Sequence, residues 1–254
     1  MIRVNGAAPS GSAPGTPYDR NTVADPHWAS VMLLLHGNGA NGSTTFTDSS
    51  ARNTTMTVGG NAIITTADKK FGTGSMVFDG TSDYLLTPAH ADFTTGTAPF
   101  TVECWAKERN VGPQHPLWSF APKSASPPYG MNLYLYNGDI HMLYGWNSYG
   151  WAIPSASNPA AATATSWHHY AFQRTAQGGF ELFIDGVLVT PTLFGAGFPT
   201  GVNFATDRLL VGAMFQTSPT EYGYDGWIDD FRYTKGVARY DTNFVPPVGE
   251  YLQA

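Results

Sequence analysis

The fold is decided by one stretch, Gly226-Trp-Ile-Asp-Asp-Phe-Arg-Tyr-Thr-Lys-Gly-Val-Ala-Arg-Tyr240. Its first part, Trp227–Tyr233, predicts a β-strand because aromatic and apolar residues recur there between polar ones. Gly236 predicts a turn after the strand, and Pro246-Pro247 follow soon afterwards. We interpret the stretch as the last strand of a β-protein and the exit of the chain from it.

The remainder of the chain also has the composition of an all-β protein. It contains 28 Gly and 18 Pro among 254 residues, and only 13% of the residues are charged. This composition disfavours helical bundles and coiled coils. The pairs Asn137-Gly138 and Asp185-Gly186 each separate two apolar runs, which predicts two-residue hairpins. We expect roughly eleven to thirteen short strands in a two-sheet sandwich.

Alternation along Phe100–Lys107 indicates which side chains enter the core. Phe100, Val102, Cys104 and Ala106 should face one way, and the intervening residues the other. Cys104 is the only cysteine, so no intrachain disulfide can form. In this apolar run we expect a buried thiol rather than a reactive one.

Residues 1–28 form a separate zone, and residues 29–254 form the predicted domain. The run Ala7–Pro17 is built from Ala, Pro, Gly, Ser and Thr, and cannot bury an apolar face. Two interpretations remain open: a disordered leader, or an arm that orders against a neighbouring subunit, including another copy of this chain. The sequence shows no signal-peptide pattern and no apolar run of about 18 residues, so we expect folding in a cytoplasm without membrane insertion.

Several motifs together resemble the laminin-G-like, concanavalin A-like jelly roll. In chain order they are Val31-Met-Leu-Leu-Leu-His36, Phe71-Gly-Thr-Gly-Ser75 with the hairpin Phe78-Asp-Gly-Thr-Ser-Asp-Tyr-Leu85, Phe100-Thr-Val-Glu-Cys-Trp105, Ser166-Trp-His-His-Tyr-Ala171, Leu182-Phe-Ile-Asp-Gly186 and the closing stretch. The resemblance implies a two-sheet antiparallel jelly-roll sandwich with an extended N-terminal arm. The closing stretch, with its downstream Asn-Phe-Val-Pro-Pro, resembles copies of this domain in phage virion proteins.

Catalysis is disfavoured by the carboxylates. Glycoside hydrolases of this fold carry Glu-x-Asp-x-x-Glu on one strand, which places acid and nucleophile about 5 Å apart. This chain has five glutamates, and none lies two residues from an aspartate. We therefore expect no enzyme activity and no required cofactor. The basic residues are scattered apart from Lys69-Lys70, which argues against nucleic acid as a partner.

Calcium is the metal that relatives of this fold bind, through aspartates and carbonyls at a sandwich rim. The candidate ligands are Asp79, Asp83, Asp229 and Asp230, since hard cations prefer oxygen ligands. The alternative for Asp79 and Asp83 is a structural role, in which their carboxylates accept backbone hydrogen bonds within the turn. His168 and His169 are adjacent in a predicted strand and point to opposite faces, so they do not suit one metal ion.

Aromatic residues gather unusually densely between residues 129 and 151. Sugar sites on sandwiches combine aromatic faces with hydrogen-bonding side chains. The candidate glycan-binding residues are Tyr144, Trp146, Asn147, Tyr149 and Trp151, in a segment that we interpret as a loop. The alternative is that these rings pack within the sheet or at a subunit interface.

Our first hypothesis is a non-enzymatic phage virion protein, either a capsid decoration or a tail-associated protein. It would be made in the host cytoplasm and displayed on the virion surface. Residues 1–28 would hold it to other virion proteins, and its body would contact host polysaccharide. A free lectin-like carbohydrate-binding module and a glycoside hydrolase are the alternatives.

Overall fold

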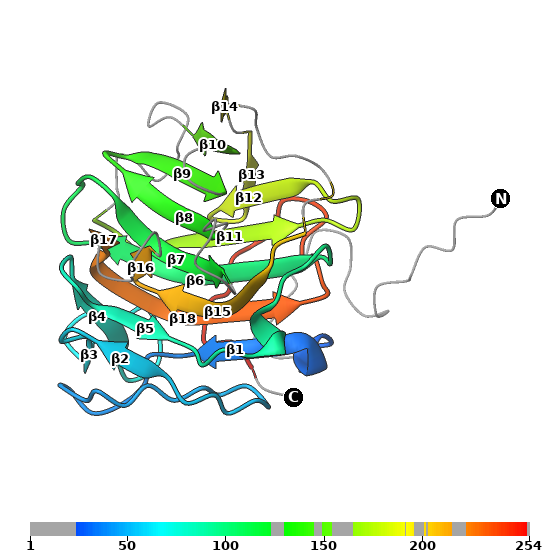
Figure 1. Ribbon diagram of the computed structural model, residues 1–254. Coiled ribbons are helices and arrows are strands. Elements are labelled where there is room, and N and C mark those ends of the chain that lie inside the picture. Colours follow the sequence, from blue (N-terminus) through cyan, green and yellow to red (C-terminus); the bar gives the residue numbers. More distant parts are fainter. Residues whose placement is uncertain are drawn as a thin grey trace.

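The computed structural model describes residues 24–122, 130–144, 149–153, 165–190, 192–195, 201, 203–214 and 222–252. Within these residues the chain forms an antiparallel sandwich of two large sheets, as expected (Figure 1). Sheet A runs in the order β13-β12-β11-β6-β18-β4-β3, with β1 also paired to β18. Sheet B runs in the order β14-β10-β9-β8-β7-β15-β5-β2.

The strands of sheet A are β1 (Val31–Leu35), β3 (Ile63–Thr65), β4 (Ser75–Asp79), β6 (Phe100–Glu108), β11 (His168–Arg174), β12 (Phe180–Ile184), β13 (Val187–Val189) and β18 (Asp225–Lys235). Those of sheet B are β2 (Thr57–Gly59), β5 (Tyr84–Leu86), β7 (His115–Pro122), β8 (Met131–Tyr136), β9 (Asp139–Tyr144), β10 (Tyr149–Ile153), β14 (Thr192–Gly195) and β15 (Thr206–Val211). A small ribbon pairs β16 (Ala213–Met214) with β17 (Tyr222–Gly223), and two short 3-10 helices are η1 (Trp28–Ser30) and η2 (Ala91–Phe93). Neither helix is long enough to cross a membrane, and the described residues contain no other that could.

The hydrophobic core lies between the two sheets and follows the alternation of the strands. Phe100, Val102, Cys104 and Ala106 all enter it from β6, which confirms the predicted pattern. Cys104 is 1% exposed, and burial raises the pKa of its thiol well above the ordinary value. This cysteine is therefore part of the core packing and holds no reactive thiolate.

Both predicted two-residue hairpins are present. Asn137 and Gly138 have φ angles of 51° and 87° between β8 and β9, and Asp185 and Gly186 have 49° and 78° between β12 and β13. Two consecutive positive φ angles match a type I′ turn, whose twist suits the flanking strands. The turn residues thus fix the register of both hairpins.

The predicted hairpin across residues 78–85 is wrong. β4 pairs in sheet A, whereas β5 pairs with β2 and β15 in sheet B, so the link between them crosses from one sheet to the other. The buried carboxylate of Asp83 closes this corner by accepting bonds from the Asn61 amide at 2.6 Å and the Asp79 amide at 3.0 Å. The corner holds both sheets together at this edge.

Both described ends of the chain cover the outer face of sheet A. Trp28 packs with Val31, Leu34 and Tyr251, and Figure 1 shows the red C-terminal segment returning beside the blue β1. Residues 237–244 also run along this face, where Tyr240 and Phe244 pack on Phe183. Strands β1, β6, β11 and β18 of sheet A are therefore buried on both faces, although an antiparallel sheet can leave one face in water.

Ion pairs are buried beneath these covering segments. The guanidinium of Arg232 lies 2.7 Å from Glu103 Oε1 and 3.1 Å from Asp25 Oδ2, and Arg239 lies 2.7 Å from Asp25. Burial opposes the ionisation of Glu103, but the neighbouring Arg232 holds the pKa of this carboxyl well below its usual range. Asp25 lies within the predicted arm of residues 1–28, so the inner end of that segment is bound to the sandwich.

Candidate functional site

The outer face of sheet B carries an aromatic cluster at the end of β8 and β9. Leu133, Leu135, Ile140 and Met142 turn into the core, so the residues between them face outward. The hairpin register places Tyr134 directly opposite His141. Their rings stack with centroids 5.1 Å apart and an interplanar angle of 25°.

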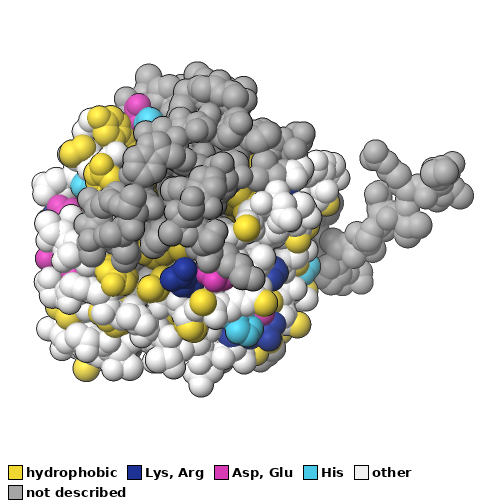
Figure 2. Space-filling model, in the orientation of Figure 1, with side chains coloured by type: hydrophobic (Ala, Val, Ile, Leu, Met, Phe, Trp, Pro, Cys, Tyr) yellow, Lys and Arg dark blue, Asp and Glu magenta, His cyan; other side chains and the backbone are white. Residues whose placement is uncertain are grey.

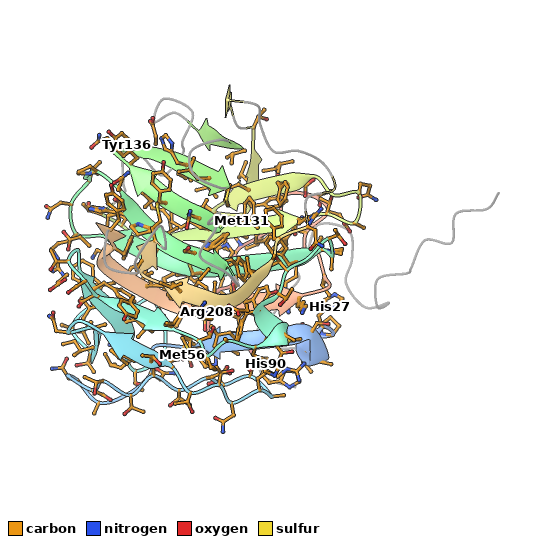
Figure 3. All side chains as sticks on the ribbon, viewed as in Figure 1. His27, Met56, His90, Met131, Tyr136 and Arg208 are labelled. Carbon is orange, nitrogen blue, oxygen red and sulfur yellow. The ribbon has the colours of Figure 1, made fainter. Side chains whose placement is uncertain are left out.

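Tyr136 extends this cluster to the surface. Its ring meets His141 edge-on at 5.5 Å, and Figure 3 shows it at the opposite end of β8 from Met131. Tyr136 is 39% exposed and is the only aromatic residue that ranks as exposed among the described side chains. An accessible ring above a fixed stack is a surface on which the apolar face of a sugar can lie.

Polar groups border the aromatic rings. Asp139 Oδ2 lies 3.7 Å from His141 Nε2. Burial lowers the pKa of His141 despite this carboxylate, and burial raises the pKa of Tyr134 to about 12. At neutral pH the imidazole is therefore mostly neutral, and a neutral imidazole can both donate and accept hydrogen bonds.

Towards the middle of the same face the side chains become buried. Ser119 donates its hydroxyl to Asn132 Oδ1 at 2.5 Å, and both residues lie under 5% exposed. Tyr134 and Leu143 pack with Met214 of β16 and Tyr222 of β17. This packing supports the stack from below and fixes the orientation of the accessible cluster.

The predicted glycan residues are placed only in part. Tyr144 ends β9, and Tyr149 and Trp151 lie in β10, which pairs with β9 and β14. Their side chains, together with Trp146 and Asn147, lie outside the described residues. The interpretation of residues 144–151 as a loop is wrong at both ends, because Tyr149–Ile153 continues the sheet.

The aromatic cluster could have been predicted in detail. Since Asn137-Gly138 is a two-residue hairpin, Tyr136 must lie opposite Asp139, and Tyr134 opposite His141. The residue types and this register are sufficient to find the stack. Ser119 carried no such signal, because its strand was not expected.

The four predicted calcium ligands lie as two separate pairs. Asp79 pairs with Asp225 across β4 and β18, and Asp229 lies four residues further along β18, about 13 Å away at the usual rise of a strand. The carboxylate of Asp79 accepts from the Thr81 amide at 2.8 Å, and that of Asp83 closes the corner described above. These bonds match the structural alternative for the first pair.

The second pair lies beneath the covering segments of sheet A. Asp229 accepts from the Lys70 and Phe71 amides at 2.8 and 3.0 Å, and Asp230 lies 2.5 Å from His36 Nδ1. In the described part of the chain, no group of three or more His, Cys, Asp or Glu residues could hold a metal. Calcium binding stays a prediction.

Comparison with known families bears directly on this architecture. Residues 79–238 match the family model described as "Concanavalin A-like lectin/glucanases superfamily". The chain belongs to this superfamily. A search of curated proteins with this sequence found no match.

Solved structures similar to this concanavalin A-like domain include binding domains of botulinum neurotoxin. They include the botulinum neurotoxin serotype D binding domain (16% identity, TM-score 0.59, 84% of this chain and 50% of that chain). The serotype D ligand-binding domain in complex with N-acetylneuraminic acid is also similar (16% identity, TM-score 0.58, 83% of this chain and 49% of that chain). The binding domain of Paraclostridial Mosquitocidal Protein 1 is similar too (12% identity, TM-score 0.58, 84% of this chain and 50% of that chain). The chain spans about half the length of these structures, and the similarity shows the fold alone.

Proposed function

We propose that this protein is a non-enzymatic adhesion domain that binds glycan on the outer face of sheet B. The observation that carries the proposal is Tyr136, the accessible ring that stands over the stacked Tyr134 and His141. Asp139, whose side chain is partly exposed, supplies a hydrogen-bonding carboxylate beside the ring. Aromatic stacking together with a few fixed polar groups suits a neutral or weakly charged sugar.

The carboxylates support adhesion over hydrolysis. Glycosidases use two carboxyl groups on either side of the scissile bond. The described part of the aromatic cluster contributes one, Asp139, and the sequence lacks the Glu-x-Asp-x-x-Glu strand motif. Steady turnover of any glycan would contradict this part of the proposal.

The first prediction is that Tyr136→Ala weakens glycan binding about tenfold, since aromatic contacts contribute roughly 1 kcal/mol or more. His141→Ala should weaken binding similarly by removing the support of the ring. Glycan arrays followed by calorimetry would measure both. Neutral hexoses are the first probes, and N-acetylneuraminic acid, found in complex with a domain of similar fold, is the anionic comparison that Asp139 should disfavour.

Trp227→Ala is the matched control for this experiment. Trp227 is a partly exposed ring on sheet A, packed against Arg109 with the guanidinium 4.5 Å from its centroid. Its removal should leave glycan affinity unchanged. The proposal would be contradicted if folded Tyr136→Ala bound glycan with unaltered affinity. It would also be contradicted if only Trp146→Ala and Trp151→Ala lost affinity, because the glycan site would then lie outside the described cluster.

The virion setting is a further part of the proposal and rests on the resemblance of residues 226–247 to phage proteins. The bond between Asp25 and Arg239 gives the predicted arm a fixed origin on the domain, from which it could hold another virion protein. Mass spectrometry of purified particles would test the setting. Recovery of the chain only as a free glycan-binding protein would favour the lectin-like module instead.

A further inference from the structure

A polar groove lies on sheet A, whereas the aromatic cluster lies on sheet B. It has a volume of about 470 Å³ and opens between the β11–β12 turn, the segment after β18 and His27. Figure 3 shows His27 beside η1, far from Tyr136. Small-molecule pockets commonly occupy about 300–1,000 Å³, so the groove is large enough for a ligand group.

The lining of the groove is rich in hydrogen-bond acceptors. Glu181 and Asp241 both line it, and Gln173, Thr175 and Gln177 add amide and hydroxyl groups. Among the described residues, His27 lines it but no lysine or arginine does. Two arginines are adjacent in sequence to lining residues, and both side chains are buried: Arg239 is engaged with Asp25 at 2.7 Å, and Arg174 donates to the Gly96 carbonyl at 2.9 Å. The described lining therefore carries two carboxylates and, apart from the imidazole of His27, no side chain that can be a cation.

Hydrogen bonds of a buried glutamine hold the floor of the groove. Gln173 is completely buried, donates to Glu181 Oε2 at 2.7 Å and accepts from the Tyr240 amide at 3.1 Å. Only one oxygen of Glu181 is used in this way, and the other has no partner among the described residues. One carboxylate oxygen is thus fixed by the protein while its second oxygen remains available to a ligand.

We propose that this groove receives a basic side chain, the guanidinium of Arg or the ammonium of Lys, from a peptide segment of a partner protein. Such a group supplies the donors and the positive charge that the lining lacks. A metal ion fits less well, because the described residues bring no three acidic or histidine ligands together. The inference is independent of glycan binding, since the two sites lie on different sheets.

The test is NMR titration of the full chain with acetyl-arginine amide and acetyl-lysine amide. We expect chemical-shift changes at the backbone amides of Gln173, Gln177 and Gly236, weakening as salt is raised. Glu181→Gln should reduce affinity about tenfold, since a charged hydrogen bond becomes neutral. This variant keeps the floor intact, because a glutamine oxygen can still accept from Gln173.

Three controls make the result decisive. Asp207→Asn, which removes an acidic charge from sheet B, should leave the affinity unchanged. Acetyl-glutamine amide should not bind, because it has a similar polar shape without the charge. Glucosamine separates an amino sugar from a peptide source. Binding of glucosamine alone, equal binding of the neutral amide, or no shift with either basic probe would overturn the proposal.

Discussion

At the scale of single residues, Asp229 is a buried carboxyl that serves the fold. Its Oδ2 accepts two backbone bonds from Lys70 and Phe71, which attaches that loop to β18. Burial, with the neighbouring charge of Asp230, raises the pKa of Asp229 to about 8. The carboxyl is then mostly protonated at neutral pH, and a calcium ion bound here would have to displace that proton.

The raised pKa of Asp229 predicts a pH-dependent stability. Between the ordinary pKa of 3.8 and about 8, the folded state binds more protons than the unfolded state, so this group lowers stability as pH rises. Asp229→Asn removes the titration. Its melting temperature relative to the natural protein should therefore increase from pH 4 to pH 8 and then level off, as measured by circular dichroism.

Asp79→Asn is a control for which we expect a pH dependence of the opposite sign. Although burial acts to raise the pKa of Asp79, its bonds to Thr81 lower it, so its charged form stabilises the fold. The relative stability of this variant should fall slightly as pH rises through the acidic range. A pH-independent difference between Asp229→Asn and the natural protein would show that the pKa of Asp229 is ordinary.

At the scale of elements, the corner between β4 and β5 depends on one carboxylate. Asp83 is 1% exposed and satisfies two backbone donors from different segments. Without it, the Asn61 and Asp79 amides would be left without their acceptor. An unsatisfied buried donor costs about 1–3 kcal/mol.

Asp83→Ala should therefore lower the free energy of unfolding by about 2 kcal/mol or more, as measured by urea denaturation. The same measurement with calcium and with a chelator separates the structural role from the metal. A structural carboxylate predicts an equal loss in both conditions. Stabilisation of the natural protein by calcium, absent in the variant, would establish Asp83 as a ligand.

The local sequence predicts some elements well and others not at all. Asn137-Gly138 fixes a hairpin and its register, and therefore the Tyr134–His141 pair. The run Asp79–Asp83 predicts a turn, but whether the next strand joins the same sheet depends on its pairing with β15, more than a hundred residues away. Burial of Ser119 likewise depends on distant packing, which neither alternation nor turn residues encode.

At the scale of the whole molecule, Arg232 connects both described ends of the chain to sheet A. It pairs with Glu103 and Asp25, and its guanidinium lies 3.5 Å from the ring centroid of Tyr251. The hydroxyl of Tyr251 in turn donates to Glu103 at 2.9 Å. Arg232, together with the buried Arg239, thus organises the segments that cover this face.

Removal of this cation should be strongly destabilising. Arg232→Met keeps apolar volume but leaves Glu103 buried without its main partner, which should lower the free energy of unfolding by about 3–5 kcal/mol. Arg109→Met is the matched control, because the pair between Arg109 and Asp225 is exposed and should contribute at most about 1 kcal/mol. Equal losses in the two variants would show that the buried network is not stabilising.

Figure 2 shows the charged side chains of the viewed face in a few separate groups, with no continuous basic band among the described residues. Adhesion through this surface would therefore depend on ring contacts and directed hydrogen bonds more than on long-range attraction. Such binding should change little with ionic strength. The acidic groove should respond strongly, so salt dependence distinguishes the two sites.

Because Asp25 and Tyr251 both touch Arg232, the chain enters and leaves the sandwich at neighbouring points. A short Gly-Ser bridge could join these points, and the backbone could be opened at another surface turn, giving a circular permutant with every strand pair retained. Because these two points are close together, the domain could also be inserted into an exposed loop of another protein. The two ends of that loop would then need to separate only slightly.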